Sequence, residues 1–305
     1  MMKKRMIKSL FVLLAVLVVL ASLAGCRNTP GPPVTDAEPP PEIVPILTVD
    51  ELPRIDGSTA NIPMASLMIQ RLTGISEIEA DKLINFTKTD GAYYALENEW
   101  ADLLLVYEGD RGIDIPGMEF YPIGRDGLVF LTNKSNPVPG LTTDQIRGIY
   151  TGAITNWSEV GGNNMAITAF QRQEASGSGT LMKKLVMGDA AMMEAPSELI
   201  PAEMGELITA LAQYDNSGGA IGYSVYYYAS KMYNNESLKM LAVDGTAPSN
   251  ATIANGSYPF INEFYAVIRA DEPEGSRTRQ VLEWLLSPEG TRCISDAGYV
   301  PVTRD

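Results

Sequence analysis

The stretch QRQEASGSGT at residues 171–180, followed by LMKKLVMGDAAMME at residues 181–194, indicates the fold of this chain. An apolar run at residues 166–170 precedes it, so the order is a strand, a loop rich in serine and glycine, and a helix. A Ser/Gly run that opens a helix directs several backbone N–H groups at one point, where the helix dipole also favours negative charge. Arg172 adds a planar guanidinium fork that suits an oxyanion. The stretch therefore predicts an anion site, although a flexible Ser/Gly loop with a serine N-cap fits the same residues.

A second stretch, LPRIDGSTANIPMASLMIQRL at residues 52–72, repeats this pattern. An extended piece ends at Gly57, and Ser58 and Thr59 stand just before apolar residues at helical spacing. Pro63 suits the first turn of that helix. Taken alone, the stretch is typical of an ordinary capped helix. Two hydroxyl-bearing helix starts in one chain suggest that both contact one ligand.

Apolar runs between and after these starts predict further strands and helices. The strands are expected at residues 101–107, 127–132, 219–228 and 264–269, and the helices at 141–150 and 277–286. The run ADLLLVY at 101–107 is continuous, as in a parallel strand that is buried on both faces, and it leads into Glu108. Ligands of open α/β sheets bind just beyond such strand ends. Strands that alternate with helices indicate α/β architecture.

The N-terminus has the three parts of a secretory signal peptide: basic residues, an apolar core, and small residues before Cys26. The sequence LAGC at residues 23–26 is similar to a bacterial lipobox. We therefore expect residues 1–25 to be a cleaved lipoprotein signal and Cys26 to be lipidated, with an uncleaved anchor as the alternative. Residues 26–45 hold seven prolines and form the expected semi-rigid tether.

Cleavage before Cys26 removes four basic and no acidic residues, which leaves 19 Lys and Arg against 37 Asp and Glu and a net charge of −18. Such a surface argues against nucleic acid as a partner, since binding of the phosphate backbone needs a positive surface. It does not exclude a small anion in a cleft, because remote surface charge is screened beyond about 8–10 Å.

The chain has no histidine, which excludes Ser-His-Asp and Cys-His triads and His-ligated zinc or haem. A lipidated Cys26 leaves Cys293 as a single thiol, so no intrachain disulfide is expected. We expect no catalytic residues, no metal site and no cofactor. A secreted hydrolase with Ser178 or Ser58 as nucleophile is the enzyme alternative that the sequence leaves open.

Several segments resemble the phosphate-binding proteins of high-affinity phosphate ABC importers, in their lipoprotein form. The segment IYTGAITNWSEVGG at residues 149–162 is the most specific of them. The others are IDGSTANIP (55–63), TDGAYYAL (89–96), ADLLLVYE (101–108), GLVFLTNKSNPV (127–138), RQEASGS (172–178), GAIGYSVYYY (219–228), YPFINEFYAVIR (258–269) and SPEGTRCISDAGYVPV (287–302). Together they cover nearly all of the chain from about residue 50.

The resemblance implies an α/β, two-lobed periplasmic-binding-protein-like fold. In this fold two crossing strands form a hinge, and the ligand binds in the cleft between the lobes. The strands after Gly127 and before Arg269 are the expected crossovers. Lobe 1 is then expected at residues 46–131 plus 252–305, and lobe 2 at residues 132–251.

The resemblance also places the phosphate donors on both lobes. They are Ser58, Thr59, Arg172, Ser176, Gly177 and Ser178. The family pattern after the arginine is usually Asp-Gly-Ser-Gly-Thr, whereas this chain has Glu-Ala-Ser-Gly-Ser-Gly-Thr. Because the register is ambiguous by two residues, Gly179 and Thr180 are alternatives to Gly177 and Ser178.

Two carboxylates complete the implied site. Glu174 stands where the family usually has an aspartate that braces the arginine. Glu108 stands near the position at which the family has an aspartate that accepts the ligand's proton. Tyr107 and Asp56 are the alternatives for the acceptor. A carboxylate acceptor favours phosphate over sulfate, because sulfate has no proton to offer and would meet a like charge.

The implied function is capture of inorganic phosphate and its delivery to the permease of an ABC transporter, without an enzymatic step. We expect a monomer that is anchored through Cys26 on the outer face of the cell membrane, as in Gram-positive bacteria. The same fold tuned to another oxyanion, or used as a surface sensor, is the second hypothesis.

Overall fold

The computed structural model describes residues 45–109, 111–174, 176–214 and 217–302. The predicted signal peptide, Cys26 and all but the last residue of the predicted tether lie outside this part of the chain. Its strands are β1 (Ile55–Gly57), β2 (Leu103–Tyr107), β3 (Met118–Asn133), β4 (Gly140–Leu141), β5 (Thr168–Ala169), β6 (Ala220–Val225), β7 (Leu238–Met240), β8 (Ala242–Val243), β9 (Ile261–Arg269) and β10 (Val300–Pro301). Its α-helices are α2 (Ile62–Thr73), α3 (Glu77–Leu83), α4 (Lys88–Glu97), α5 (Thr143–Thr151), α6 (Gly177–Leu181), α7 (Met204–Gln213), α8 (Asn250–Ala254), α9 (Arg277–Leu286) and α10 (Pro288–Asp296).

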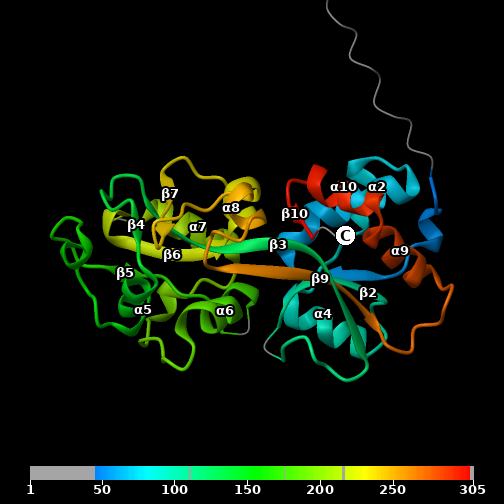
Figure 1. Cartoon of the computed structure of the whole chain (residues 1–305), viewed down its shortest axis with the longest axis horizontal. Helices are drawn as coiled ribbons and strands as arrows, with labels where there is room; N and C mark the ends of the chain where they lie inside the picture. The colour runs from blue at the N-terminus through cyan, green and yellow to red at the C-terminus, as the bar shows by residue number, and fades with distance from the viewer. Residues whose placement is uncertain (1–44, 110, 175, 215–216, 303–305) are drawn as a thin grey trace, which may run out of the picture. The chain divides into compact units, whose positions relative to one another are not determined.

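The long strand β3 joins the two parts of the main sheet. In the described residues this sheet has the order β1-β2-β9-β3-β6-β5, with β10 and β7 also paired to β3. Residues 118–127 of β3 pair antiparallel with β9, whereas residues 128–132 pair antiparallel with β6. Figure 1 shows β3 and β9 side by side, with a group of helices and strands at each end.

We name the two groups by their elements. The first lobe contains β1, β2, β9 and β10 with α2, α3, α4, α9 and α10, and the second lobe contains β5, β6 and β7 with α5, α6 and α7. This two-lobed α/β arrangement agrees with the predicted fold class.

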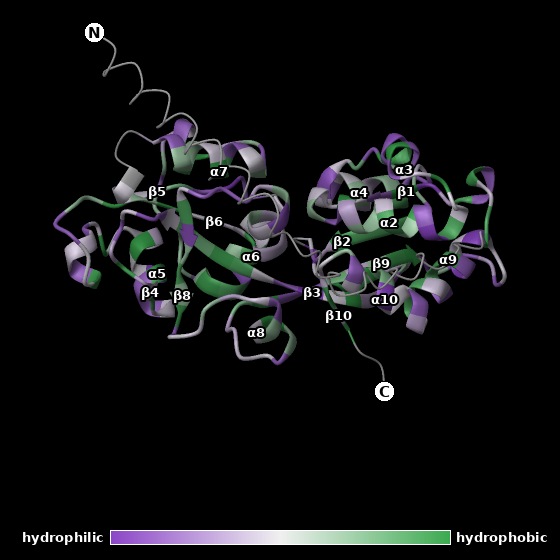
Figure 2. Ribbon diagram, turned by 90° about the horizontal axis from the view of Figure 1, so that it is seen from above, coloured by the Kyte–Doolittle hydropathy of each residue, from purple (hydrophilic) through white to green (hydrophobic). Residues whose placement is uncertain are grey.

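Strand β2 is buried on both faces, as its continuous apolar run predicts. Leu104 and Val106 belong to a core cluster with residues of α4, while Leu103 and Leu105 belong to a cluster with residues of α2. Strand β1 pairs parallel with β2. Figure 2 shows β2 and β9 as largely hydrophobic strands with helices around them. The carboxyl ends of β1 and β2 are thereby held at the edge of the first lobe that carries the candidate site.

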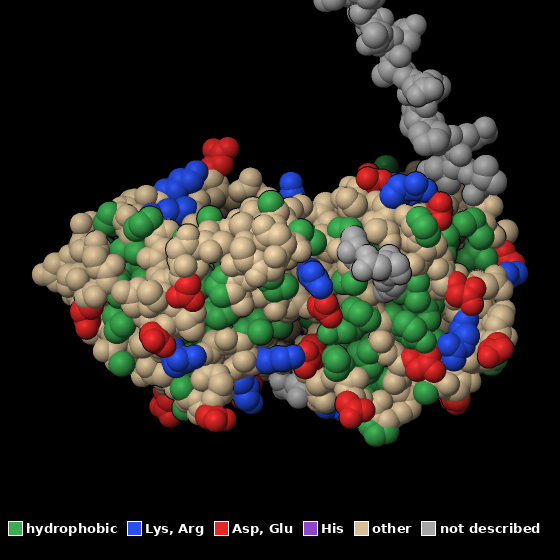
Figure 3. Space-filling view, viewed as in Figure 1, with side chains coloured by type: hydrophobic (Ala, Val, Ile, Leu, Met, Phe, Trp, Pro, Cys, Tyr) green, Lys and Arg blue, Asp and Glu red, His purple; other side chains and the backbone are tan. Residues whose placement is uncertain are grey.

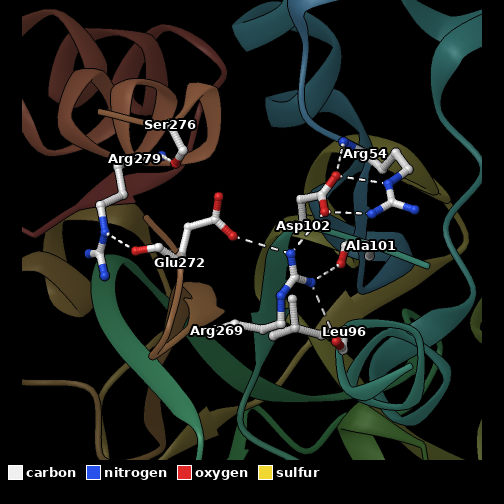
Figure 4. Close-up of polar contacts among 8 residues, drawn as sticks. All are labelled: Arg54, Leu96, Ala101, Asp102, Arg269, Glu272, Ser276 and Arg279. Atoms are coloured by element: carbon white, nitrogen blue, oxygen red, sulfur yellow. Dashed lines mark hydrogen bonds and ion pairs between the residues drawn. The ribbon is translucent and has the colours of Figure 1, made fainter. Parts of the chain in front are cut away.

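A polar cluster fixes the opposite end of β2 (Figure 4). The Asp102 carboxylate accepts hydrogen bonds from the guanidinium groups of Arg54 and Arg269, at 2.6–2.9 Å. Arg269 also donates to the Ala101 carbonyl oxygen at 2.6 Å. Partial burial raises the pKa of Asp102, but the hydrogen bonds from Arg54 and Arg269 outweigh it and lower this pKa to about 2. The cluster therefore ties the loop before β1 and the end of β9 to the start of β2.

Three elements differ from the sequence-based expectation. The strand predicted at residues 219–228 ends at Val225, and a π-helical segment, η7 (Tyr228–Met232), follows it. Strand β3 begins at Met118 rather than at residue 127, and a register shift at Pro122 interrupts the alternation that would have revealed its first half. The predicted helix at 181–194 ends at Met187, as a π-helical segment η4 (Met182–Met187) that follows α6. Gly188, which follows this segment, adopts a φ of 58°, a value that glycine tolerates more readily than other residues.

The surface carries both signs of charge. On the face drawn in Figure 3, the Lys and Arg side chains of the described residues are scattered among Asp and Glu. Within the described ranges, no helix is both long and apolar enough to cross a membrane.

Cys293 lies in α10 and is fully buried. Burial raises the pKa of its thiol to about 12. The thiol is therefore protonated at physiological pH, as expected for a cysteine that serves as a small apolar core residue.

Candidate anion-binding site

A cavity of about 220 Å³ lies between the two lobes. The first lobe contributes the turn after β1, the start of α4 and the end of β2. The second lobe contributes residues 172–173 and 176–178, the start of α7 and the end of β6. The wall thus combines carboxyl ends of strands with amino ends of helices, which is where open α/β sheets bind ligands.

The structure brings six of the eight predicted residues to this cavity. They are Ser58, Thr59, Arg172, Ser176, Gly177 and Ser178. The first two come from the first lobe and the other four from the second lobe, as the sequence predicted. Glu108 and Glu174 are not part of the wall.

Arg172 carries a buried positive charge at the cavity. Its backbone N–H donates to the Tyr223 hydroxyl at 2.9 Å, and its Nη1 donates to the Pro201 carbonyl oxygen at 2.6 Å. The residue is only 6% exposed, and Nε has no hydrogen-bond partner among the described residues. Burial lowers the pKa of the guanidinium, because removal from water disfavours its charge. In the described part of the chain no carboxylate forms an ion pair with Arg172, so its charge remains available to an anion.

The Ser/Gly loop forms the start of α6, as the sequence predicted. Ser176 is the N-cap: its Oγ accepts from the Gly179 N–H at 3.1 Å and donates to the Gln173 carbonyl oxygen at 2.7 Å. Ser178 is fully buried, and its Oγ has no hydrogen-bond partner within the described residues. Gly179 and Thr180, the alternative register, do not line the cavity.

A pair of hydroxyls forms the first-lobe side of the cavity. The Oγ of Ser58 lies 2.8 Å from Oγ1 of Thr89, and it accepts from the Tyr107 N–H at 3.2 Å. Thr89 was not assigned a role in the sequence analysis, although the segment TDGAYYAL contains it. Thr89 could have been predicted from its place in the first turn of a helix, because the same pattern of a hydroxyl residue at a helix start identified Ser58 and Ser178. A Cβ on Gly177 would lie 2.9 Å from Thr89 Oγ1, so glycine at 177 lets the two lobes approach here.

The structure does not place the Glu108 and Glu174 carboxylates in the wall of this cavity. The Glu108 carboxylate forms an ion pair with the Lys184 ammonium of the second lobe, so it does not face the cavity. The Glu174 carboxylate bonds to Lys183 at 2.7 Å instead of bracing Arg172, and its side chain is 70% exposed. The hydrogen bond from Lys183 lowers the pKa of Glu174. Both glutamates are therefore neutralised by lysines of the segment η4.

Asp56 and Tyr107, the alternative proton acceptors, also form hydrogen bonds with other groups of the protein. The Asp56 carboxylate accepts from the Gly57 N–H and from the N–H and hydroxyl of Thr87, at 2.6–2.7 Å, and so joins the end of β1 to the start of α4. Tyr107 lines the cavity, but its hydroxyl donates to Asp126 at 2.7 Å. Among the described residues, the carboxylates in the wall are those of Asp90 and Glu203, which the sequence analysis did not propose.

An ion pair crosses the cavity wall between the lobes. Nζ of Lys88, at the start of α4, lies 2.5 Å from Oε1 of Glu203, just before α7. Both residues line the cavity. In the described ranges, no group of three or more His, Cys, Asp and Glu residues is arranged to hold a metal ion.

Comparisons with known proteins agree with this geometry. A model of the PBP superfamily domain matches residues 49–289. The chain belongs to the PBP superfamily.

Its relatives include phosphate-binding proteins. The phosphate-binding protein PstS of Bacillus subtilis is 26% identical over 197 residues, which are 64% of this chain and 62% of that protein. PstS of Borreliella burgdorferi is 24% identical over 182 residues, which are 58% of this chain and 63% of that protein. The matches span less than two thirds of the length of these curated relatives.

Solved structures show the same fold. An ABC-type phosphate transport receptor from Vibrio cholerae has a TM-score of 0.63 at 21% identity, over 81% of this chain and 98% of that one. The predicted two-lobed α/β fold and the resemblance to phosphate-binding proteins are thus confirmed.

Proposed function

We propose that this PBP superfamily member captures inorganic phosphate in the interlobe cavity and delivers it to the permease of an ABC transporter. The observation that carries the proposal is the buried Arg172 guanidinium, whose Nε is unpartnered within the described residues, in a cavity wall that also contains the equally unpartnered Ser178 hydroxyl. A buried charge without an opposite charge is heavily penalised, so the site is complete only when an anion is bound.

The donors in the wall are numerous enough for tight binding. Arg172, Ser178, Ser58 and Thr89, with the amides at the start of α6, come from both lobes. Hydrogen bonds to a charged group contribute about 1.5–3 kcal/mol each, and micromolar affinity needs about 8 kcal/mol. Four such bonds contribute about 6–12 kcal/mol, which reaches this requirement, and the amides at the start of α6 add to it against the costs of association and closure.

The wall carboxylates support selectivity for an anion that carries a proton. The Asp90 carboxylate would repel fully deprotonated sulfate, whereas phosphate can donate a proton to it; Glu203 already forms an ion pair with Lys88.

The hinge and the membrane attachment are part of the same proposal. β3 and β9 act as the crossing strands, with lobe 1 at residues 46–131 plus 252–305 and lobe 2 at 132–251. The lipobox-like sequence ending at Cys26 supports a lipid-anchored, extracytoplasmic monomer of the Gram-positive type. The named relatives are binding proteins of transporters, which supports a function without catalysis.

Calorimetry on residues 43–305, which form one compact unit, tests the phosphate site. The protein is first unfolded and refolded to remove any carried-over ligand. We expect tight binding of phosphate and no heat with sulfate. Arg172→Ala should weaken phosphate binding by about 3 kcal/mol or more, because a charge-assisted donor is lost from a buried site.

Arg292→Ala is the matched control, since Arg292 is 67% exposed and pairs with Glu289 three residues away in the same helix. It should leave the affinity unchanged, and both variants should unfold cooperatively. If refolded wild-type protein binds no phosphate, or if Arg172→Ala binds it as tightly as the control, the proposed site is wrong.

A further inference from the structure

A groove along α7 adjoins the anion cavity. Thr59, Glu203 and Tyr228 line both the cavity and a neighbouring groove of about 640 Å³. The rest of the groove is formed by α7 and by the ring of Tyr233. The two spaces therefore adjoin at these three residues, so a ligand held in the cavity lies next to the groove along α7.

The cavity wall contains both hydrogen-bond donors and apolar groups. Arg172, Ser178, Ser58 and Thr89 are the donors, whereas Met204, Val225 and Tyr228 present apolar or aromatic groups. A bare phosphate ion has an oxygen on every side, and an oxygen that faces an apolar wall loses its hydrogen bonds to water without replacement. A phosphate ester or a phosphonate has an organic substituent in that direction, which an apolar wall accommodates.

The groove is also acidic and aromatic. Glu203 and Glu206 line it, and of these two carboxylates Glu203 is the one that forms an ion pair within the described residues, with Lys88. Tyr228 and Tyr233 stack at a centroid distance of 4.7 Å and an interplanar angle of 15°. A Cβ on Gly205 would lie 2.7 Å from the Tyr233 ring, so glycine at 205 lets this ring lie against α7. Carboxylates and aromatic faces both favour a cation.

We propose that the site also binds small phosphate monoesters and phosphonates, with the phosphoryl group at Arg172 and the substituent in the groove along α7. An ammonium-bearing substituent is preferred over a neutral one, and a carboxylate-bearing substituent is disfavoured. This inference rests on the proposed function, because the phosphoryl group uses the same donors.

The test compares inorganic phosphate with three monoesters of similar size: phosphoethanolamine, propyl phosphate and phosphoglycolate. Their substituents carry a positive charge, no charge and a negative charge. Calorimetry on residues 43–305 should give binding of phosphate, phosphoethanolamine and propyl phosphate, with phosphoethanolamine tighter than propyl phosphate by about fivefold, the upper range for an exposed ion pair. Phosphoglycolate should bind most weakly of the three esters.

Two variants locate the substituent in the groove. Thr209 is exposed and lines the groove but not the cavity, so Thr209→Trp should weaken both phosphoethanolamine and propyl phosphate by about tenfold and leave phosphate unchanged. Glu206 caps α7 by accepting from the Glu203 N–H at 3.0 Å, a role that glutamine also fills. Glu206→Gln should therefore remove the preference for phosphoethanolamine over propyl phosphate without affecting stability.

The outcomes separate the two proposals. If phosphate binds but none of the esters does, the groove is not used and only the proposed function stands. If the esters bind but Thr209→Trp leaves their affinities unchanged, the substituent lies elsewhere and the inference is wrong. If phosphate itself does not bind, both proposals fail.

Discussion

Two buried polar atoms at the cavity lack a partner among the described residues: Nε of Arg172 and Oγ of Ser178. Each unsatisfied buried group of this kind destabilises a fold by about 1–3 kcal/mol. Both groups belong to the loop that the sequence singles out as an anion site. Their cost to the unliganded protein becomes a gain in affinity when an anion accepts their hydrogen bonds.

Substitution of Ser178 by alanine therefore has opposite effects on stability and on binding. The free energy of unfolding should stay constant or rise by up to about 1 kcal/mol, because an unsatisfied buried hydroxyl is removed. The affinity for phosphate should fall by about 1.5–3 kcal/mol, because a donor to the anion is lost. Urea unfolding without ligand, together with calorimetry, measures the two quantities.

Ser176→Ala is the matched control from the same loop. Ser176 caps α6, so its replacement should lower the stability by about 0.5–2 kcal/mol. A Ser178→Ala variant that loses stability but binds phosphate normally would assign Ser178 a purely structural role.

The residues of the site that could be predicted from sequence are those whose signal is local. Arg172 and Ser176 to Ser178 are neighbours in the chain, and a Ser/Gly run before a helix is enough to identify them. Glu108 and Glu174 could not be assigned in this way, since a carboxylate's role depends on its partner in space. Their partners, Lys184 and Lys183, lie 76 and 9 residues away.

At the scale of elements, strand β3 carries a buried carboxylate where its pairing changes from β9 to β6. Asp126 is 2% exposed, and it accepts from the Tyr107 hydroxyl at 2.7 Å and from the N–H groups of Gly127 and Tyr227 at 2.7 and 3.1 Å. Burial raises the pKa of Asp126 to about 6, and these hydrogen bonds oppose that effect only in part. The Tyr107 ring also lines the cavity, so this network links the cavity to the crossing strands.

The raised pKa of Asp126 predicts a loss of stability as the pH rises from about 4 to 6. The unfolded chain releases this proton near the ordinary value of 3.8, whereas the folded protein retains it up to about 6. Asp126 therefore contributes about 3 kcal/mol to the free energy of unfolding below pH 3.8, and this contribution is lost as the pH rises through 6.

Asp126→Asn should abolish this part of the pH dependence. Urea unfolding of both proteins at pH 4 and pH 7 gives the comparison, and the expected signature is a smaller decrease for the variant. Asp102 does not affect this comparison, because its pKa in the folded protein is about 2. Its contribution to stability is therefore lost only at lower pH, as the pH falls. Equal pH slopes in the two proteins would show that Asp126 is not the group responsible.

Most elements could be predicted from their periodicity, as the agreement at β2, α2 and α9 shows. The exceptions have tertiary causes. The first half of β3 contains Pro122 at a register shift, and the helix after the Ser/Gly loop stops at Gly188, whose φ is known only from the fold. A sequence pattern indicates which secondary structure a segment prefers, but it does not show where tertiary contacts end or shift that element.

At the scale of the whole molecule, two ion pairs connect the lobes across the cleft. Lys88 of the first lobe pairs with Glu203 at 2.5 Å, and Lys184 of the second lobe pairs with Glu108. Lys88 has a φ of 71°, an unfavourable conformation for a lysine that costs about 1 kcal/mol. Both pairs stabilise the arrangement of the lobes in this structure, and neither could be predicted from sequence because the partners are 115 and 76 residues apart.

Loss of one interlobe pair should accelerate release of phosphate. Lys184→Met keeps the length of the side chain but removes the charge, so it should raise the dissociation rate by up to about fivefold, since an exposed pair contributes at most about 1 kcal/mol. Raising the salt concentration from about 0.01 M to 1 M should have a similar effect on the wild type, because the Debye length falls from about 30 to 3 Å. Stopped-flow measurement of phosphate release gives these rates.

Lys183→Met is the control, since the ion pair of Lys183 with Glu174 lies within the second lobe. It should leave the rate of release unchanged. An equal acceleration by both substitutions would point to a general charge effect and not to a connection between the lobes.

The burial of Cys293 makes the folded part of this chain suitable for site-directed labelling. Cys26 and Cys293 are the two cysteines of the sequence, and a protein that begins after Cys26 retains only a thiol whose pKa is raised to about 12. A cysteine introduced on each lobe would therefore react selectively with a fluorophore or a spin label. A protein that begins after Cys26 thus needs no substitution of its remaining cysteine before it can serve as an optical sensor of its own ligand.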